Sequence, residues 1–250
     1  MNQDFLTKVL ATGSNSFGGE NKMATITEYV GSAAGATVGL VIANLDPQLR
    51  KGIKLDSKYR SIGIVSSRSC GATLIWAADD AVKATNTEIS DIQFARDMKG
   101  GTGRGATVIF AAEDVSDARR AVEIMLQSTE THLGDVYACD AGTVEFHYAA
   151  RASIALEKAY GAKQGKSFGI VLGAPAAVGL VMADTALKTA SVDIVNFVSV
   201  EEASYANEIA VTFTGDSGAV RQSVIAAREV GVNILRSMGC EPKSLGNPSF

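Results

Sequence analysis

The chain has 250 residues, of which 46% are hydrophobic and 20% charged, and its formal net charge is −4. This balance is typical of a globular protein and excludes a disordered or collagen-like chain. The acidic excess argues against a nucleic-acid binder, which usually carries a basic face. Alanine (37 residues) and glycine (25 residues) make up a quarter of the sequence, so we expect backbones that pack closely.

The N-terminal segment, residues 1–36, is expected to lie outside the folded domains. Asp4 and Lys8 interrupt it and it has no long apolar core, so it is not a secretory signal. Residues 11–22 are rich in Gly, Ser and Asn, as in a flexible linker. Before the linker, four apolar side chains share one face of a short helical run: Phe5, Leu6, Val9 and Leu10. A frayed terminus is the alternative.

Two uncharged stretches imitate membrane spans. Glu28 and Asp46 bracket 17 such residues, and Lys166 and Asp184 bracket another 17. Both stretches fall short of the roughly 20 apolar residues that a spanning helix needs, and Gly or Pro interrupts both. We therefore expect no membrane span.

An internal repeat organises the chain. Residues 61–65 (SIGIV) recur at 167–171 (SFGIV), and residues 78–83 (ADDAVK) recur at 183–188 (ADTALK). Further matches continue in order, with a shift that falls from 106 to 102 residues, as loop deletions would cause. The chain is predicted to be a tandem duplication, with a first domain over 37–141 and a second over 142–250.

Each copy is predicted to run strand, short helix, strand, helix, two strands and a long helix. In the first copy we expect strands at 38–43, 61–66, 89–94 and 106–111, and helices starting at Asp46-Pro47, ending near Thr85 and starting at Asp114 or Ser116. In the second copy we expect strands at 144–149, 168–172, 194–198 and 209–214, and helices over 152–160, ending near Ala190 and starting at Asp216 or Ser217. Helices that cover one face of a sheet make this an α+β sandwich of ferredoxin-like type.

Cysteine and histidine give no recognisable site. Cys70, Cys139 and Cys240 are odd in number, widely spaced and without a CxxC pair, so neither a disulfide framework nor a zinc site is indicated. His132 and His147 complete no site with them at a recognised spacing, and nothing else converges on the histidines. We expect no metal, no cofactor and a reducing cytoplasmic location.

Two motifs imitate enzyme signatures. Residues 101–106 (GTGRGA) fit the dinucleotide fingerprint, but the residues that follow are β-branched and predict a strand where that motif needs a helix. Residues 215–218 (GDSG) imitate a serine nucleophile, but Asp216 and Ser217 are better explained as a helix N-cap, since the first copy has Asp114 and Ser116 at the matching place. No catalytic constellation emerges, and we expect a protein that is not an enzyme.

Two loops at matching places have diverged. Residues 95–104 (ARDMKGGTGR) are glycine-rich and basic, whereas residues 199–208 (SVEEASYANE) are acidic. Function is usually varied in loops on a preserved scaffold. The glycines at 100, 101, 103 and 105, which the second copy lacks, are expected to line an opening.

The repeated helix A-D-x-A-(V/L)-K at 78–83 and 183–188 resembles the edge helix of bacterial microcompartment (BMC) shell domains. A strand and a short helix precede residues 61 and 167, as in the circularly permuted form of that domain. Further stretches are similar to tandem BMC-domain shell proteins of propanediol- and ethanol-utilisation compartments: YRSIGI at 59–64, GDVY at 134–137, ASIALEK at 152–158 and TGDSGAVRQ at 214–222. The resemblance covers roughly residues 25–245.

The resemblance implies a homotrimer that forms a pseudohexameric tile, meets other BMC shell proteins edge to edge and encloses enzymes. It implies tile-edge contacts at Lys83, Asn86 and Lys188. It implies pores for small polar metabolites, with candidate lining residues in the two loops: Lys99, Gly100, Gly101, Thr102, Gly103, Glu201, Glu202, Ser204 and Tyr205. The N-terminal apolar face would then attach the shell to encapsulated enzymes. The rival interpretation is a cytosolic enzyme or nucleotide-binding sensor built from two ferredoxin-like domains.

Overall fold

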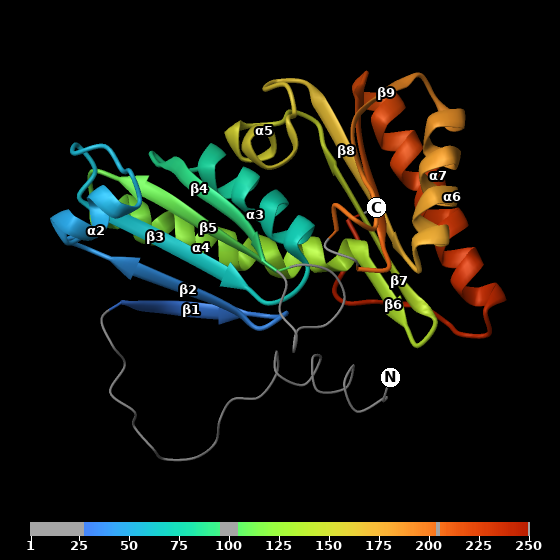
Figure 1. Ribbon diagram of the computed structural model, residues 1–250, viewed down its shortest axis with the longest axis horizontal. Helices are drawn as coiled ribbons and strands as arrows, with labels where there is room; N and C mark the ends of the chain where they lie inside the picture. The colour runs from blue at the N-terminus through green and yellow to red at the C-terminus, as the bar shows by residue number, and fades with distance from the viewer. Residues whose placement is uncertain (1–27, 96–104, 204–205, 250) are drawn as a thin grey trace, which may run out of the picture. The chain divides into compact units, whose positions relative to one another are not determined.

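The computed structural model describes residues 28–95, 105–203 and 206–249, and its contacts divide the chain after Glu130 into two units. Each unit contains an antiparallel sheet and repeats one order of elements: two strands, a short helix, a strand, a helix, two strands and a long helix (Figure 1). The α+β architecture and the duplication predicted from the sequence are confirmed.

The first unit has a five-stranded sheet in the order β1-β2-β3-β5-β4, with every neighbouring pair antiparallel. The predicted strands and helices are present, and the sequence missed only the outer strand β1. A tight turn with Gly35 at φ +76° joins β1 to β2. In chain order the elements are β1 (Tyr29–Ala33), β2 (Thr37–Ile42), α2 (Pro47–Gly52), β3 (Ser61–Ser67), α3 (Gly71–Lys83), β4 (Glu88–Ala95), β5 (Gly105–Ala112) and α4 (Val115–His132).

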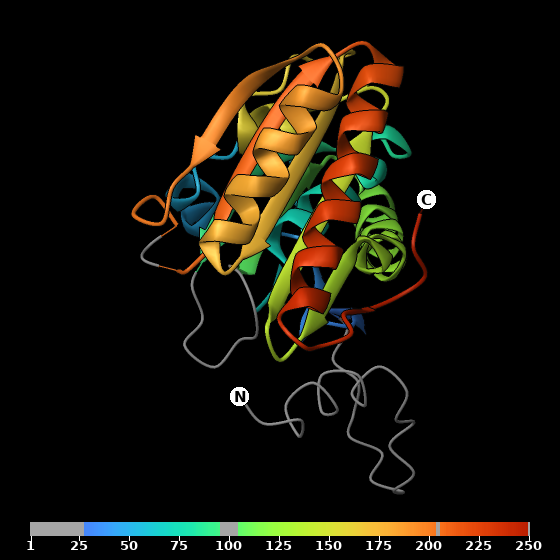
Figure 2. The ribbon, with the colours of Figure 1, turned by 90° about the vertical axis from the view of Figure 1, so that its right-hand side faces the viewer.

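The second unit has a six-stranded sheet in the order β11-β6-β7-β8-β10-β9, and α6 and α7 lie side by side on one face of it (Figure 2). Strand β6, which the sequence also missed, pairs with β7. In chain order the elements are η1 (Leu133–Asp135), β6 (Val136–Cys139), β7 (Gly142–Ala149), α5 (Ile154–Tyr160), β8 (Ser167–Ala174), α6 (Ala176–Thr189), β9 (Val192–Val198), β10 (Ile209–Gly215), α7 (Ser217–Ser237) and β11 (Lys243–Ser244).

The sheets of the two units begin earlier in the chain than the sequence repeat predicts. The sequence repeat places boundaries at 36/37 and 141/142, whereas β1 and β6 lie before these boundaries and pair with β2 and β7. The two uncharged stretches form the β1–β2 hairpin and the pair β8 and α6. Among the described residues, no helix combines the length and apolar character that crossing a membrane requires.

Short-range signals set the ends of the short helices. The Asp46 carboxylate accepts hydrogen bonds from the Gln48 and Leu49 amides at 2.8 and 3.3 Å, which caps α2 as its sequence predicts. Gly161 ends α5 in the left-handed conformation, with φ +77°. Asp216 occupies the N-cap position of α7, but its side chain makes no capping bond.

Glycine lets the long helix of each unit approach its sheet. A Cβ atom at Gly63 in β3 would lie 2.7 Å from the Ala118 carbonyl oxygen of α4. At the matching Gly169 in β8, a Cβ atom would lie 2.9–3.0 Å from the side chains of Phe213, Val220 and Val224. The surplus of small residues therefore brings helix and sheet close together, as their repetition in the sequence predicts.

The C-terminal segment is fastened within the second unit. Strand β11 pairs with β6, and a disulfide joins Cys139 to Cys240, so the expectation of no disulfide is wrong. Spacing alone could not indicate this pair because 101 residues separate the two cysteines. Arg236 donates to both Glu241 carboxylate oxygens at 2.7–3.1 Å, which holds the pKa of Glu241 below its usual value.

Candidate functional site

The repeated edge helix forms the same ion pair in both units. Lys83 pairs with Asp79 in α3, and Lys188 lies 2.7 Å from Asp184 in α6. Residues four apart lie on the same side of a helix, which explains both pairs. Asp79 is buried and Asp184 is exposed, so the same local contact lies in two different environments.

The apolar residues beside these pairs differ more strongly. Ile75 and Trp76 in α3 are 0% and 2% exposed, whereas their counterparts in α6, Leu180 and Val181, are 52% and 44% exposed. The edge strands behave in the same way: Ile89 in β4 is 3% exposed, and its counterpart Ile194 in β9 is 51% exposed. Ile89 faces Phe110 and Ile194 faces Phe213, so the two isoleucines hold matching positions in their sheets.

The second unit therefore exposes apolar residues whose counterparts in the first unit are buried. We call this surface the α6–β9 surface and define it by Leu180, Val181, Ile194 and Phe197, all of which are at least 41% exposed. Both elements adjoin the same strand, because α6 contacts β10 and β9 pairs with β10. Most soluble chains do not leave several large apolar side chains together in water, so this surface is a candidate interface.

The acidic loop between β9 and β10 is organised around its own residues. The Glu202 carboxylate accepts a hydrogen bond from the Ser199 amide at 2.8 Å, and the Ser199 hydroxyl accepts one from the Glu202 amide at 3.3 Å. This reciprocal arrangement is that of a capping box. Glu201 is also exposed, and no turn bond fixes its carboxylate among the hydrogen bonds described for the loop.

Most of the candidate pore and anchoring residues lie outside the described residues. This applies to Lys99, Gly100, Gly101, Thr102, Gly103, Ser204 and Tyr205, and to the N-terminal residues Phe5, Leu6, Val9 and Leu10. The three tile-edge candidates are described and exposed: Lys83, Asn86 and Lys188. Gly105 is described and is buried, with the Ser67 carbonyl oxygen 2.2 Å from the position of a Cβ atom. Close packing against the end of β3 is therefore a sufficient reason for this glycine.

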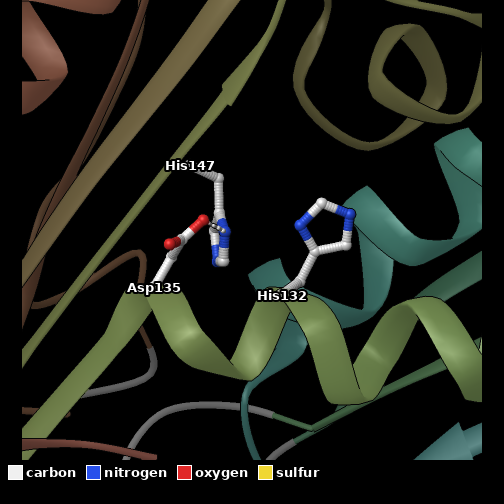
Figure 3. Close-up of side chains that lie close together, drawn as sticks. All are labelled: His132, Asp135 and His147. Atoms are coloured by element: carbon white, nitrogen blue, oxygen red, sulfur yellow. Dashed lines mark ion pairs between the residues drawn. The ribbon is translucent and has the colours of Figure 1, made fainter. Parts of the chain in front are cut away.

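The two histidines converge, contrary to expectation. His132, Asp135 and His147 lie together where the second unit begins (Figure 3). The rings of His132 and His147 meet edge to face, with centroids 5.8 Å apart. The cluster could not be predicted from the sequence without β6, because the β6–β7 hairpin is what returns His147 towards Asp135.

Comparison with known proteins decides the family. The family model for the BMC domain matches residues 61–146 and 167–241. The chain is 51% identical over 230 residues to the bacterial microcompartment shell protein PduB of Citrobacter freundii, which covers 92% of this chain and 85% of that protein. This chain is a tandem BMC-domain shell protein. Shell proteins of this kind are structural components of bacterial microcompartments rather than enzymes, and the rival interpretation as an enzyme or sensor is not favoured.

Solved structures agree with this assignment. EtuB from Clostridium kluyveri superposes with a TM-score of 0.87 at 55% identity, over 90% of this shell protein and all of that chain. A structure described as a trimeric microcompartment shell protein PduB superposes with a TM-score of 0.85 at 41% identity, over 90% and 100% of the two chains. The shell protein is therefore of the PduB/EtuB type.

The family match also reveals the permuted order. The first BMC match runs from β3 through α4 into β7, so it crosses the boundary between the units. The sheet of the first unit is instead completed by β2, which precedes β3 in the sequence and pairs with it. A shell domain whose closing strands come first is the circularly permuted arrangement predicted from the sequence.

Proposed function

We propose that three copies of this shell protein form a pseudohexameric tile in which the six BMC domains surround a threefold axis. The observation that supports this is the unequal burial of matching residues. In a ring of alternating first and second domains, matching faces receive similar cover. Ile75, Trp76 and Ile89 are already buried within one chain, so the exposed α6–β9 surface is where a neighbouring copy would supply the missing cover.

Sedimentation tests the tile directly. The wild-type chain should sediment at about three times 26.0 kDa. Ile194→Glu or Leu180→Glu would place a charge in the proposed interface and should release single chains, because an unpaired buried charge is costly. Met238→Glu is the matched control, since Met238 is as exposed as Ile194 but lies at the end of α7, outside the α6–β9 surface. A monomeric wild type, or trimers in both interface variants, would refute the proposal.

We infer further that the tile carries pores for small polar metabolites, formed by the loops between β4 and β5 and between β9 and β10. The candidates are the loop residues named above, and Glu201 is the described one best suited to face a pore, since Glu202 caps Ser199. Shells that carry Glu201→Lys should pass anionic and neutral metabolites in a changed ratio. Shells that carry Asp140→Lys, which changes an exposed carboxylate in the β6–β7 turn, should not. Equal permeability of wild-type, Glu201→Lys and Asp140→Lys shells would contradict a role for Glu201 in a pore.

The edge residues and the N-terminal segment complete the proposal. Lys188 is the more available edge lysine, because 74% of its side chain is exposed against 39% for Lys83. Lys188→Glu should therefore weaken sheet formation by trimers more than Lys83→Glu does.

Deletion of residues 1–22 should release encapsulated enzymes from purified shells while trimers persist. Enzymes that stay attached after the deletion would contradict the anchoring role.

A further inference from the structure

Three side chains of types that bind metals meet at the start of the second unit, and the proposed tile gives them no role. His132 ends α4, Asp135 lies in η1 and His147 lies in β7. Each offers one ligand atom, and these three atoms lie within 4.8 Å of one another (Figure 3). The β6–β7 register, in which Val136 faces Glu145, brings together residues that are 12 to 15 positions apart in the sequence.

The buried ring of His147 is oriented as a metal ligand would be. Its Nε2 atom lies 2.9 Å from Oε1 of Glu145, a carboxylate that is itself buried. In the tautomer in which Nε2 donates to this carboxylate, Nδ1 is the ring nitrogen that can bind a metal. Nδ1 is the atom on the side of Asp135, 3.9 Å from Oδ2. A histidine that donates one ring N–H to a carboxylate and presents the other nitrogen is the usual arrangement around a protein-bound metal.

The carboxylate of Asp135 is held for the same purpose. Its Oδ1 atom accepts a hydrogen bond from the Ser249 amide at 2.8 Å, which turns Oδ2 towards His147. Asp135, Glu145 and His147 are each at most 5% exposed. A divalent cation between Nδ1 and Oδ2 would offset the negative charge that the two carboxylates bring into this buried site. His132 is only half-buried, so this side of the cluster is partly exposed to solvent.

We propose that His132, Asp135 and His147 bind a divalent transition metal of the zinc type, with water in the fourth position. Two imidazoles and a carboxylate favour zinc over magnesium or calcium, which take oxygen ligands. Tetrahedral zinc with bonds of about 2.0–2.2 Å needs ligand atoms roughly 3.4 Å apart. Oδ2 and Nδ1 are close to that spacing, and a small rotation of the half-buried His132 supplies the third ligand.

The site belongs to the second unit and not to the duplicated scaffold. Strand pairing places Leu40 and Val38 of β2 at the positions of His147 and Glu145, since Leu40 faces Ile64 and His147 faces the matching Ile170. The bound metal would join the end of α4 to the β6–β7 hairpin and, through Ser249, to the C-terminal segment. We therefore assign it a structural role in this part of the shell protein.

Metal titration tests the assignment. The full chain, without a histidine tag and with the Cys139–Cys240 disulfide intact, is first freed of metal with a chelator. It is then titrated with Co²⁺ and afterwards with Zn²⁺. The expected result is one Co²⁺ per chain with the visible absorption of a tetrahedral site, displaced by Zn²⁺, and a rise in the melting temperature. His132→Gln and Asp135→Asn should each weaken binding at least tenfold, and Glu145→Gln about tenfold, as for residues that orient a ligand. Asp140→Asn, which changes an exposed carboxylate nearby, should bind as the wild type does.

Two variants guard against loss of folding. His132 is half-buried, and Asn at position 135 keeps an oxygen that can accept from Ser249, so both chains should retain the circular dichroism of the wild type. Absence of stoichiometric uptake by the folded wild type would overturn the proposal. So would uptake that persists in both His132→Gln and Asp135→Asn, or a Co²⁺ spectrum with thiolate charge-transfer bands, which would place the metal on cysteine instead.

Discussion

The first and second units carry the same edge helix in opposite surroundings. Both helices form the Lys–Asp pair that their sequence predicts, yet α3 buries ten of its thirteen residues and α6 buries five of fourteen. The repeated sequence thus fixes the local contact in both copies, while the environment of that contact is set by what packs against the helix. The exposed copy is the one available to another chain, and this difference is the basis of the proposed tile.

The sharpest test of this comparison is an alanine at matching apolar positions. Ile75→Ala should lower the free energy of unfolding by about 2–5 kcal/mol, because it leaves a cavity in a closed core. Leu180→Ala, a change of equal size at the exposed position, should cost a single chain less than about 1 kcal/mol. Urea unfolding in the Ile194→Glu background, where single chains are expected, measures both. Equal losses would mean that α6 is covered within its own chain.

The two lysines test the same contrast through charge. Lys83→Met removes the cation beside the buried Asp79 carboxylate and should lower the free energy of unfolding by about 2 kcal/mol. This is less than the loss expected for a fully buried ion pair, because Lys83 is partly exposed. Lys188→Met breaks an exposed pair and should change stability by less than about 0.5 kcal/mol. Denaturant midpoints at matched protein concentration compare the two variants. A larger loss at Lys188 would reverse the assignment of buried and exposed edges.

The matching glycines should differ by a smaller amount. A methyl group at Gly63 would meet the Ala118 backbone carbonyl and should cost about 1–2 kcal/mol, because a helix backbone cannot move aside cheaply. At Gly169 the three nearest atoms belong to side chains rather than to backbone and lie slightly farther away, at 2.9–3.0 Å, so Gly169→Ala should cost less than Gly63→Ala. Thermal melts of the two variants rank the costs. A more harmful Gly169→Ala would show that the second unit packs more rigidly than its contacts indicate.

The smallest expected effect concerns the C-terminal segment, which only the second unit has. Hydrogen bonds from Arg236 lower the pKa of Glu241 in the folded chain. The stabilisation is therefore fully present above the unfolded value of 4.5 and is lost as the pH falls through the lower folded value. Hydrogen exchange of the residues after α7 should accelerate in this acid range in the wild type.

Glu241→Gln should remove this pH dependence of hydrogen exchange, because a glutamine side chain does not titrate. Glu123→Gln, which changes a glutamate paired with Arg120 on α4 of the first unit, is the matched control and should leave the C-terminal segment unaffected. The effect is small because both members of the Arg236–Glu241 pair are exposed to solvent. Identical exchange in wild type and Glu241→Gln would show that β11 and the disulfide alone hold the segment.

Much of the fold could be predicted from local signals. Asp46 before Pro47 and Gly161 after Tyr160 mark helix ends through their own hydrogen bonds and dihedral angles, and both act as predicted. Strands β1 and β6 could not be found in the same way. They are only five and four residues long, so pairing with β2 and β7 is what makes them strands.

The candidate sites divide along the same line. The edge lysines are visible in the sequence because an i, i+4 pair depends on helix geometry alone. The His132–Asp135–His147 cluster and the Cys139–Cys240 disulfide are not, because each depends on strands that turn back on themselves. The duplication, the order of elements and the family resemblance can thus be predicted without a structure. Which of two matching residues is buried cannot be, because burial depends on packing between distant segments rather than on the residue and its neighbours.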